Sequence, residues 1–92
     1  MMKLAKVIGN VVSTRKEEAL VGFKILLVEE LDAKSKQLTG NTFVAVDTLG
    51  AGLLDTVLIV QGSGARVISE THRSAPLDAA IVGIVDKWDV NL

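Results

Sequence analysis

The sequence predicts a small all-β protein: a five-stranded closed barrel with short helical turns late in the chain. Five separate runs are rich in the aliphatic and β-branched residues that favour strands, and polar or glycine-containing stretches divide them. Gly9 and Gly83 lie inside the first and last runs, where they indicate bends that let a sheet close and hide its edges. Because no segment has a long amphipathic helical period, an open sheet covered by a helix is disfavoured. The 92 residues suffice for one domain, residues 1–92.

The elements follow in order along the chain. Glycine at position 9 predicts a bulge in the first strand, and the polar stretch Asp32–Asn41 predicts a turn between the second and third. Two short helical pieces are expected at Ala65–Glu70, after a candidate N-cap at Ser63, and at Pro76–Ala80, where proline suits the first helical position. The five expected strands are Lys3–Ser13, Phe23–Glu29, Thr42–Asp47, Thr56–Gln61 and Ile81–Asp86.

Two glycine-bearing loops flank the fourth strand, one over residues 47–55 and one over residues 62–66. A dinucleotide-binding loop leads into a full helix, but here Thr56 begins a strand directly after Asp55, so no helix fits. Parallel strands need a connection of about a dozen residues or more, so we expect the third and fourth strands to pair antiparallel. The glycines then serve as tight turns, or as places where another chain comes close.

The composition is more aliphatic than one small core requires. Hydrophobic residues make up 49% of the chain and the mean hydropathy is +0.42. A chain of this size buries only about 60–65% of its unfolded surface. We therefore expect part of the aliphatic surplus to lie between subunits, since large exposed apolar patches usually mark interfaces.

Charge and residue usage exclude several classes of partner. The 10 basic and 11 acidic residues give a net charge of −1, so there is no basic footprint for nucleic acid or an anionic membrane. The chain has no cysteine, which removes disulfide and thiol chemistry. Its longest apolar run, Ala79–Val85, is far shorter than the ~18 residues of a membrane span, and lysines near the N-terminus make a poor signal peptide. The expected location is the cytoplasm.

Catalytic and metal-binding sets are incomplete. His72 is the single histidine and lies in a polar loop, while Ser63 has no obvious base. No zinc-type ligand set exists, and we expect no catalytic residue, metal or cofactor. A paired-carboxylate site is the alternative to plain turn chemistry, because aspartates at strand ends commonly bind nearby backbone N–H groups. The aspartates concerned are Asp47, Asp55, Asp78 and Asp86.

Two binding functions stay open from the residues alone. Backbone amides around Gly62–Arg66 with the Arg66 guanidinium would suit a carboxylate or phosphate, unless Arg66 pairs with an aspartate of the chain. Five-stranded barrels also often bind single-stranded nucleic acid, which requires a basic groove and stacking aromatics that this composition lacks. A small-anion- or nucleic-acid-binding module is therefore the alternative function.

Several segments, taken together and in order, also carry a family resemblance over nearly the whole length. These segments are Lys6–Thr14 with Lys16, Gly22–Leu26, Val44–Gly52, Val57–Ile59, Gly62–Arg66 and Asp78–Asp86. The chain resembles the pentameric vertex proteins of bacterial microcompartment shells, the family found in carboxysomes and in ethanolamine- and propanediol-type organelles. It departs from the family pattern at Leu54, where the family often has glycine, and at Gly64, where it often has serine.

The resemblance implies an OB-like barrel assembled into a cyclic pentamer. Such pentamers close the vertices of a shell built mainly of hexameric tiles in the bacterial cytoplasm. The implied function is structural and not enzymatic, with no nucleic acid, membrane or cofactor involved. We hypothesise that Gly62, Ser63 and Gly64 lie near the five-fold axis and edge a narrow pore. The hypothetical subunit contact is formed by Asp47, Gly50, Gly52, Asp55 and Arg66.

Overall fold

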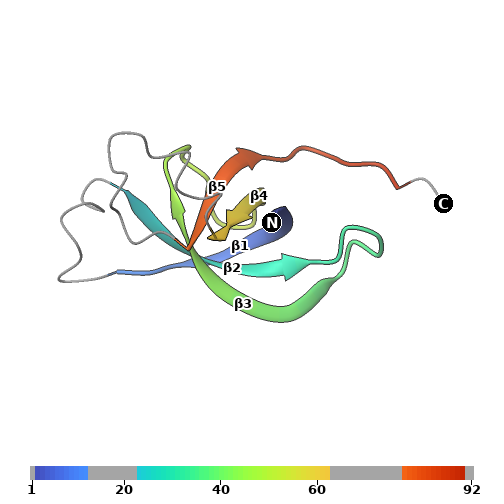
Figure 1. Ribbon diagram of the computed structural model, residues 1–92, viewed down its shortest axis with the longest axis horizontal. Coiled ribbons are helices and arrows are strands. Elements are labelled where there is room, and N and C mark those ends of the chain that lie inside the picture. The colour runs from blue at the N-terminus through green and yellow to red at the C-terminus, as the bar shows by residue number, and fades with distance from the viewer. Residues whose placement is uncertain (1, 13–22, 63–77, 91–92) are drawn as a thin grey trace.

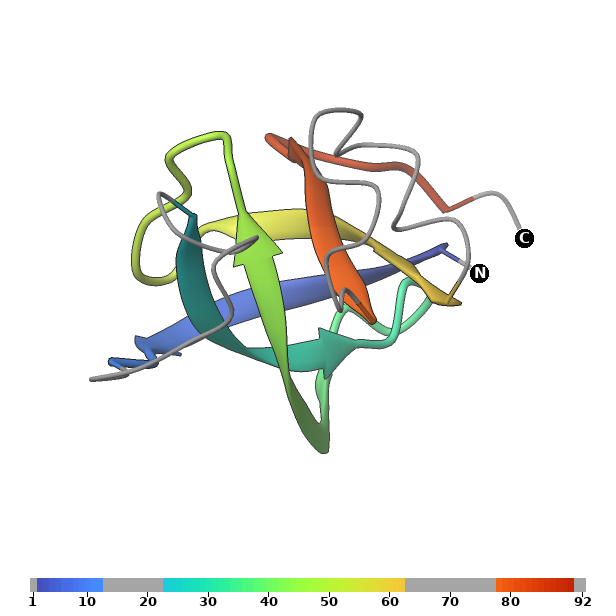
Figure 2. The ribbon, with the colours of Figure 1, turned by 60° about the vertical axis from the view of Figure 1, so that its left-hand side comes forward.

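The computed structural model describes residues 2–12, 23–62 and 78–90, and its strands close into a barrel (Figures 1 and 2). The strands are β1 (Met2–Asn10), β2 (Lys24–Leu31), β3 (Leu38–Asp47), β4 (Thr56–Gln61) and β5 (Ala79–Ile84). Their order around the barrel is β1-β2-β3-β5-β4, and β1 pairs antiparallel with both β2 and β4, which closes the sheet. The predicted all-β, five-stranded OB-like barrel is confirmed. Within the described ranges, no helix is long and apolar enough to cross a membrane.

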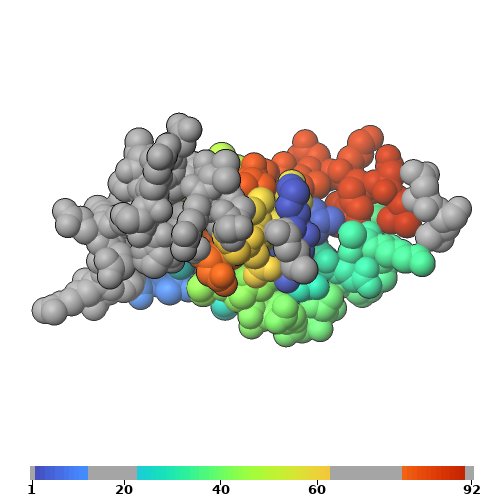
Figure 3. Space-filling view, in the orientation of Figure 1, coloured from blue at the N-terminus to red at the C-terminus, as the bar shows by residue number. Residues whose placement is uncertain are grey.

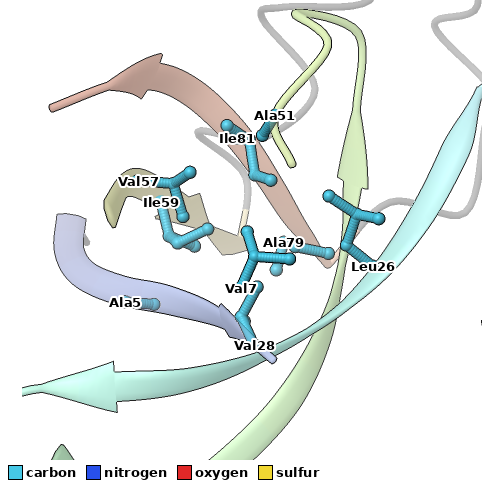
Figure 4. Packing of buried hydrophobic residues seen from close by; sticks show 10 residues of the cluster. Ala5, Val7, Leu26, Val28, Ala51, Val57, Ile59, Ala79 and Ile81 are labelled. Atoms are coloured by element: carbon cyan, nitrogen blue, oxygen red, sulfur yellow. The ribbon is translucent and has the colours of Figure 1, made fainter. Parts of the chain in front are cut away.

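The core lies inside the barrel and is made of small and medium aliphatic side chains (Figure 4). Alternate strand residues point inward, as in the buried pair Ala5 and Val7 of β1 and the buried pair Val57 and Ile59 of β4. Fully burying a side chain such as Val or Ile contributes about 1.5–3 kcal/mol. The complete cluster is Ala5, Val7, Leu26, Val28, Ala45, Ala51, Val57, Ile59, Ala79 and Ile81, with Phe43 packed against it.

Bulges bend the barrel at the two glycines that the sequence singled out. The β1–β2 register shifts between Val7 and Gly9, and the β4–β5 register shifts beside Gly83, the partner of Leu58. A bulge inserts an unpaired residue, kinks its strand and increases the local twist. The predicted bends at both glycines are confirmed.

Several predicted boundaries differ from the structure. The predicted polar turn Asp32–Asn41 is too long, because β2 extends to Leu31 and β3 already begins at Leu38, where exposed polar residues continue the hairpin ladder. The helical turn predicted over Pro76–Ala80 is wrong at its end, since Ala79 and Ala80 are buried and pair with β4. Strand β5 ends at Ile84 instead of Asp86, and β1 ends at Asn10. The helix predicted over Ala65–Glu70 lies outside the described residues.

The predicted antiparallel pairing of the third and fourth strands is wrong. Strand β5 lies between them, parallel to β3 through Val46–Ala80 and Asp47–Ile81 and antiparallel to β4. The segment over residues 48–55 therefore crosses one intervening strand, about 10 Å at the usual strand spacing. A short loop can reach that far, so loop length alone does not specify adjacent strands.

A clasp joins the C-terminal segment to the β2–β3 hairpin, at the end of the molecule where both project beyond the barrel (Figures 1 and 3). The indole Nε1–H of Trp88 donates a 2.7 Å hydrogen bond to the carbonyl of Ala33. In return, Lys36 Nζ donates to the Trp88 carbonyl at 3.1 Å and lies 5.0 Å from the centroid of its ring. Asp32 accepts backbone N–H groups inside the same turn, which fixes its shape.

Candidate functional site

The first glycine loop is organised by one buried carboxylate at the end of β3. Asp47 is only 2% exposed. Its Oδ1 accepts the N–H of Leu49 and its Oδ2 accepts the N–H of Ala51, both at 2.8 Å. Aspartate at such a position binds the backbone ahead of it and so fixes the turn. Both oxygens are used structurally, which favours the turn interpretation of Asp47 over the acid–base one.

Lys24 supports the same loop from the neighbouring strand. It is the cross-strand partner of Asp47, and its Nζ lies 4.0 Å from Asp47 Oδ2. The same ammonium donates a 3.1 Å hydrogen bond to the carbonyl of Ala51. The sequence reasoning missed this residue, although an antiparallel pairing of the start of the second strand with the end of the third would have indicated it.

The second half of the loop is a turn closed by Asp55. Its Oδ2 accepts the N–H of Gly52 at 2.8 Å, and its own N–H donates to the Gly52 carbonyl at 3.0 Å. Gly50 has a φ of 87°, a left-handed backbone that favours glycine. Gly52 has no such requirement, because an added Cβ would meet Asp55 Oδ2 at an ordinary 3.7 Å. The backbone conformation of the protomer therefore favours glycine at position 50, but nothing in the protomer requires glycine at position 52.

Backbone hydrogen bonds hold the loop against β1. The N–H of Leu54 donates to the Val7 carbonyl at 2.8 Å, and the N–H of Val7 donates to the Asp55 carbonyl at 2.9 Å. Leu54 has a φ of 71°, unusual for a bulky residue. Three leucines of the loop, Leu49, Leu53 and Leu54, are exposed. Hydrogen bonds therefore fix the backbone of the loop, while its leucine side chains are exposed to solvent.

The second glycine loop begins at the other end of β4. Gly62 has a φ of 70°, and its N–H donates a 2.9 Å hydrogen bond to the carbonyl of Asp78. Strand β4 separates Gly62 from Asp55 by about 20 Å at the usual rise per residue. Ser63, Gly64 and Arg66 lie outside the described residues, so the pore-edge and anion-site hypotheses stay predictions. His72 lies outside them as well.

The structure thus brings together four of the eight predicted site residues: Asp47, Gly50, Gly52 and Asp55 share one loop. In the part of the chain that is described, no group of three or more His, Cys, Asp or Glu could hold a metal ion. The aspartates at 47 and 55 bind backbone N–H groups of the loop, and each of those bonds shapes a turn. Nothing in this geometry resembles a reaction centre.

Two acidic groups of the β2–β3 hairpin, Glu30 and Asp32, have pKa values shifted from their usual ones. Hydrogen bonds from Asn41 and from Lys3, the latter 3.0 Å away, lower the pKa of Glu30 below its usual 4.5. The backbone N–H groups of Lys34 and Ser35 lower the pKa of Asp32 below its usual 3.8. The Asp32 shift comes from hydrogen bonds within its own turn, whereas part of the Glu30 shift comes from a hydrogen bond that links β1 to the hairpin.

The outer face of the barrel is apolar along two pairs of strands. On β1 and β4, Met2 lies opposite Val60 and Leu4 lies opposite Leu58. On β2 and β3, Leu27 lies opposite Val44, which is 52% exposed. An antiparallel sheet with one face in water normally alternates apolar and polar residues. The outward residues of this barrel carry the aliphatic surplus that the composition predicted.

Comparison with known proteins gives consistent matches over the whole fold. The family model described as ethanolamine utilisation protein EutN/carboxysome matches residues 2–86. The carboxysome shell vertex protein CcmL of Synechocystis sp. is 48% identical over 89 residues, covering 97% of this chain and 87% of that protein. The bacterial microcompartment shell vertex protein GrpN of Rhodospirillum rubrum is 49% identical over 85 residues, covering 92% of this chain and 93% of that protein.

A solved structure extends the match to three dimensions. The pentameric microcompartment shell protein GrpN from Rhodospirillum rubrum superposes with a TM-score of 0.85 and 43% identity. The superposition covers 98% of this chain and 99% of that one.

Proposed function

The chain belongs to the EutN/CcmL family of microcompartment shell vertex proteins, and from that membership we propose that it forms a cyclic pentamer that closes the vertices of a polyhedral shell. The observation that carries the proposal is the superposition on a pentameric shell protein over 98% of the chain. Membership of a family of structural shell proteins also agrees with the predicted absence of enzymatic activity.

Two apolar patches on the outer surface of the barrel favour assembly into a ring. A cyclic assembly uses a heterologous contact, in which two different patches of one subunit meet its two neighbours. The apolar pairs on β1–β4 and on β2–β3 are two such patches on different parts of the barrel wall. Their coverage by neighbouring subunits would account for the aliphatic surplus, since exposed apolar patches usually mark interfaces.

We assign the loop over residues 47–55 to the subunit contact. Asp47 and Asp55 hold its backbone in one conformation, so little ordering cost remains when a neighbour binds. Gly52 leaves room that the protomer itself does not use, which would suit the close approach of another chain. Arg66 is proposed to pair with an aspartate within or between subunits.

The second loop is proposed to edge the axis of the ring. Gly62 begins it in a left-handed conformation, and Ser63 and Gly64 follow as small residues. Small residues allow several copies of one loop to converge around a rotation axis. Replacing Gly64 with Trp should obstruct the axis or disrupt the ring; an intact pentamer with an open axial channel would exclude this placement.

In the shell, the partners would be hexameric tiles, and the location would be the shell of an organelle in the bacterial cytoplasm. A pentamer supplies the curvature that flat hexagonal layers lack. No role for nucleic acid, a membrane or a cofactor is proposed.

The first test is the native mass of the chain in solution. A species of five chains, each of 9.8 kDa, is expected, whereas a monomer at all accessible concentrations would contradict the proposal. The second test co-expresses the chain with a hexameric shell tile and images the product by electron microscopy. Closed particles are expected with the chain, and open sheets or tubes without it. Particles that close equally well in its absence would remove the vertex role.

A further inference from the structure

Leu54 combines a strained backbone with an exposed apolar side chain. Its φ is 71°, in the left-handed region where the Cβ of an L-residue crowds the following carbonyl oxygen. Among non-glycine residues in the described ranges, only Lys36 shares a positive φ. The Leu54 residue remains 65% exposed, so burial inside the protomer offsets little of this cost. Its neighbour Leu53 is 67% exposed.

The strained geometry is fixed from both sides. The N–H of Leu54 is bonded to the Val7 carbonyl, and the carbonyl of the next residue, Asp55, accepts the N–H of Val7. Asp55 is itself tied to Gly52 through its side chain and its backbone. Leu54 could adopt an ordinary φ only if the hydrogen bonds that attach the loop to β1 were broken.

Backbone strain of this kind persists where the surrounding structure fixes it and where function uses it. A glycine would satisfy the conformation at position 54 without strain. What the leucine adds is an apolar side chain on a rigid platform beside a second exposed leucine. That addition is useful only to a partner that removes both side chains from water.

We propose that Leu54, together with Leu53, is an apolar anchor that packs against a neighbouring copy of this chain in the ring, and that this contact offsets the backbone strain of the free protomer. The inference rests on the proposed pentamer. A second copy is the favoured occupant because the loop belongs to the same barrel that superposes on a pentameric protein over nearly its full length. The loop also carries the four residues already assigned to the subunit contact.

The test compares ring stability with protomer stability in the full-length chain. Leu54→Gly removes both the strain and the side chain. Leu54→Asn replaces the apolar side chain with a polar one that tolerates the left-handed region, and Leu54→Met keeps an apolar side chain. Leu38→Asn is the matched control, because Leu38 is also exposed but lies at the far end of β3 from the loop. Native mass over a dilution series reports the ring, and urea unfolding of the diluted, dissociated chain reports the protomer.

We expect Leu54→Gly and Leu54→Asn to raise the concentration at which the ring dissociates by tenfold or more. The urea midpoint of the dissociated Leu54→Gly protomer should equal or exceed that of the wild type. Leu54→Met and Leu38→Asn should leave the ring close to wild type.

Rings of Leu54→Gly and Leu54→Asn that dissociate at the wild-type concentration would overturn this inference while leaving the proposed pentamer standing. A lower urea midpoint for the Leu54→Gly protomer would also overturn it, since the strain would then be absent. A wild-type chain that forms no ring would remove both proposals together.

Discussion

Replacing Asp47 with Asn tests whether one buried carboxylate holds the contact loop together. The wild-type oxygens accept two backbone N–H groups at 2.8 Å, from Leu49 and Ala51, and the residue is 2% exposed. In Asp47→Asn one oxygen becomes an NH₂ donor, which faces an N–H donor and leaves it without an acceptor. Losing a hydrogen bond to a charged group while burying an unpaired donor costs about 2–3 kcal/mol.

That loss is large for a domain of this size. A change of 1 kcal/mol moves the melting temperature of a 60–100-residue domain by about 4–8 °C, so Asp47→Asn should melt roughly 10–20 °C lower. The assay is thermal unfolding followed by circular dichroism, at one fixed protein concentration because assembly also shifts the melting temperature. Hydrogen exchange of the Leu49 and Ala51 amides should increase in the same variant.

Lys24→Met is the control for the contacts of the Lys24 ammonium, which are the ion pair with Asp47 and the hydrogen bond to the Ala51 carbonyl. The Lys24 side chain is 57% exposed and its Nζ lies 4.0 Å from the Asp47 carboxylate, so the pair contributes less than about 1 kcal/mol. The melting temperature of Lys24→Met should fall by no more than about 8 °C. An Asp47→Asn protein that melts within about 3 °C of the wild type would refute the reasoning. Equal losses for the two variants would assign the stabilisation to the contacts of Lys24 instead of the hydrogen bonds that Asp47 accepts from Leu49 and Ala51.

Three further predictions each concern one residue, at positions 50, 88 and 30. Gly50→Ala should destabilise the protomer by about 1–2 kcal/mol in urea unfolding because its φ is 87°; an unchanged midpoint would contradict the left-handed turn. Trp88→Phe should cost about 1 kcal/mol and speed hydrogen exchange of the β2–β3 turn, since the indole hydrogen bond is lost; unchanged exchange would exclude the clasp. Hydrogen bonds from Asn41 and Lys3 lower the pKa of Glu30 in the folded state, so the stabilisation is present above its unfolded value of 4.5 and disappears as the pH falls through the lower folded value. Urea midpoints of wild type and Glu30→Gln should therefore converge in acid; a constant gap from pH 6 to pH 3 would contradict this.

Strand positions were predictable where the chain marks both ends clearly. The fourth strand was predicted over Thr56–Gln61 and lies there, because Asp55 and Gly62 punctuate it on either side. The start of β3 was missed because polar, exposed residues such as Thr39 and Asn41 follow Leu38, which pairs with Leu31 of β2. Strand pairing there depends on the partner strand and not on hydrophobicity.

Strand order was not available from local signals. Proline at position 76 with alanines at positions 79 and 80 favours a helical turn by propensity, yet Ala79 and Ala80 belong to β5, which pairs with both β3 and β4. For the same reason the loop over residues 48–55 was expected to join adjacent strands. When a strand from later in the chain lies between two consecutive strands, the residues that connect those two strands do not indicate it.

In the candidate site, too, residues with partners nearby in the sequence were predictable and those with distant partners were not. Asp47, Gly50 and Asp55 were identifiable because their partners lie within a few residues, where turn chemistry is local. Lys24 was missed because it reaches the loop from another strand. At Leu54 the sequence showed only a departure from the family's usual glycine, and the φ of 71° gives that departure its physical meaning.

The two kinds of residue in this loop have different roles. Hydrogen bonds within the protomer account for the two aspartates, and a left-handed backbone accounts for Gly50. Replacing any of the three should therefore lower the stability of the chain whether or not it assembles. The same bonds do not account for Leu53 and Leu54, which the protomer leaves exposed, one of them in a strained conformation. The loop is already fixed before a neighbour binds, so it loses little conformational freedom on binding. More of the free energy gained by burying its apolar side chains then contributes to affinity. Ring assembly of this chain should therefore respond to the leucines more than to its charges, and should weaken little as salt concentration rises.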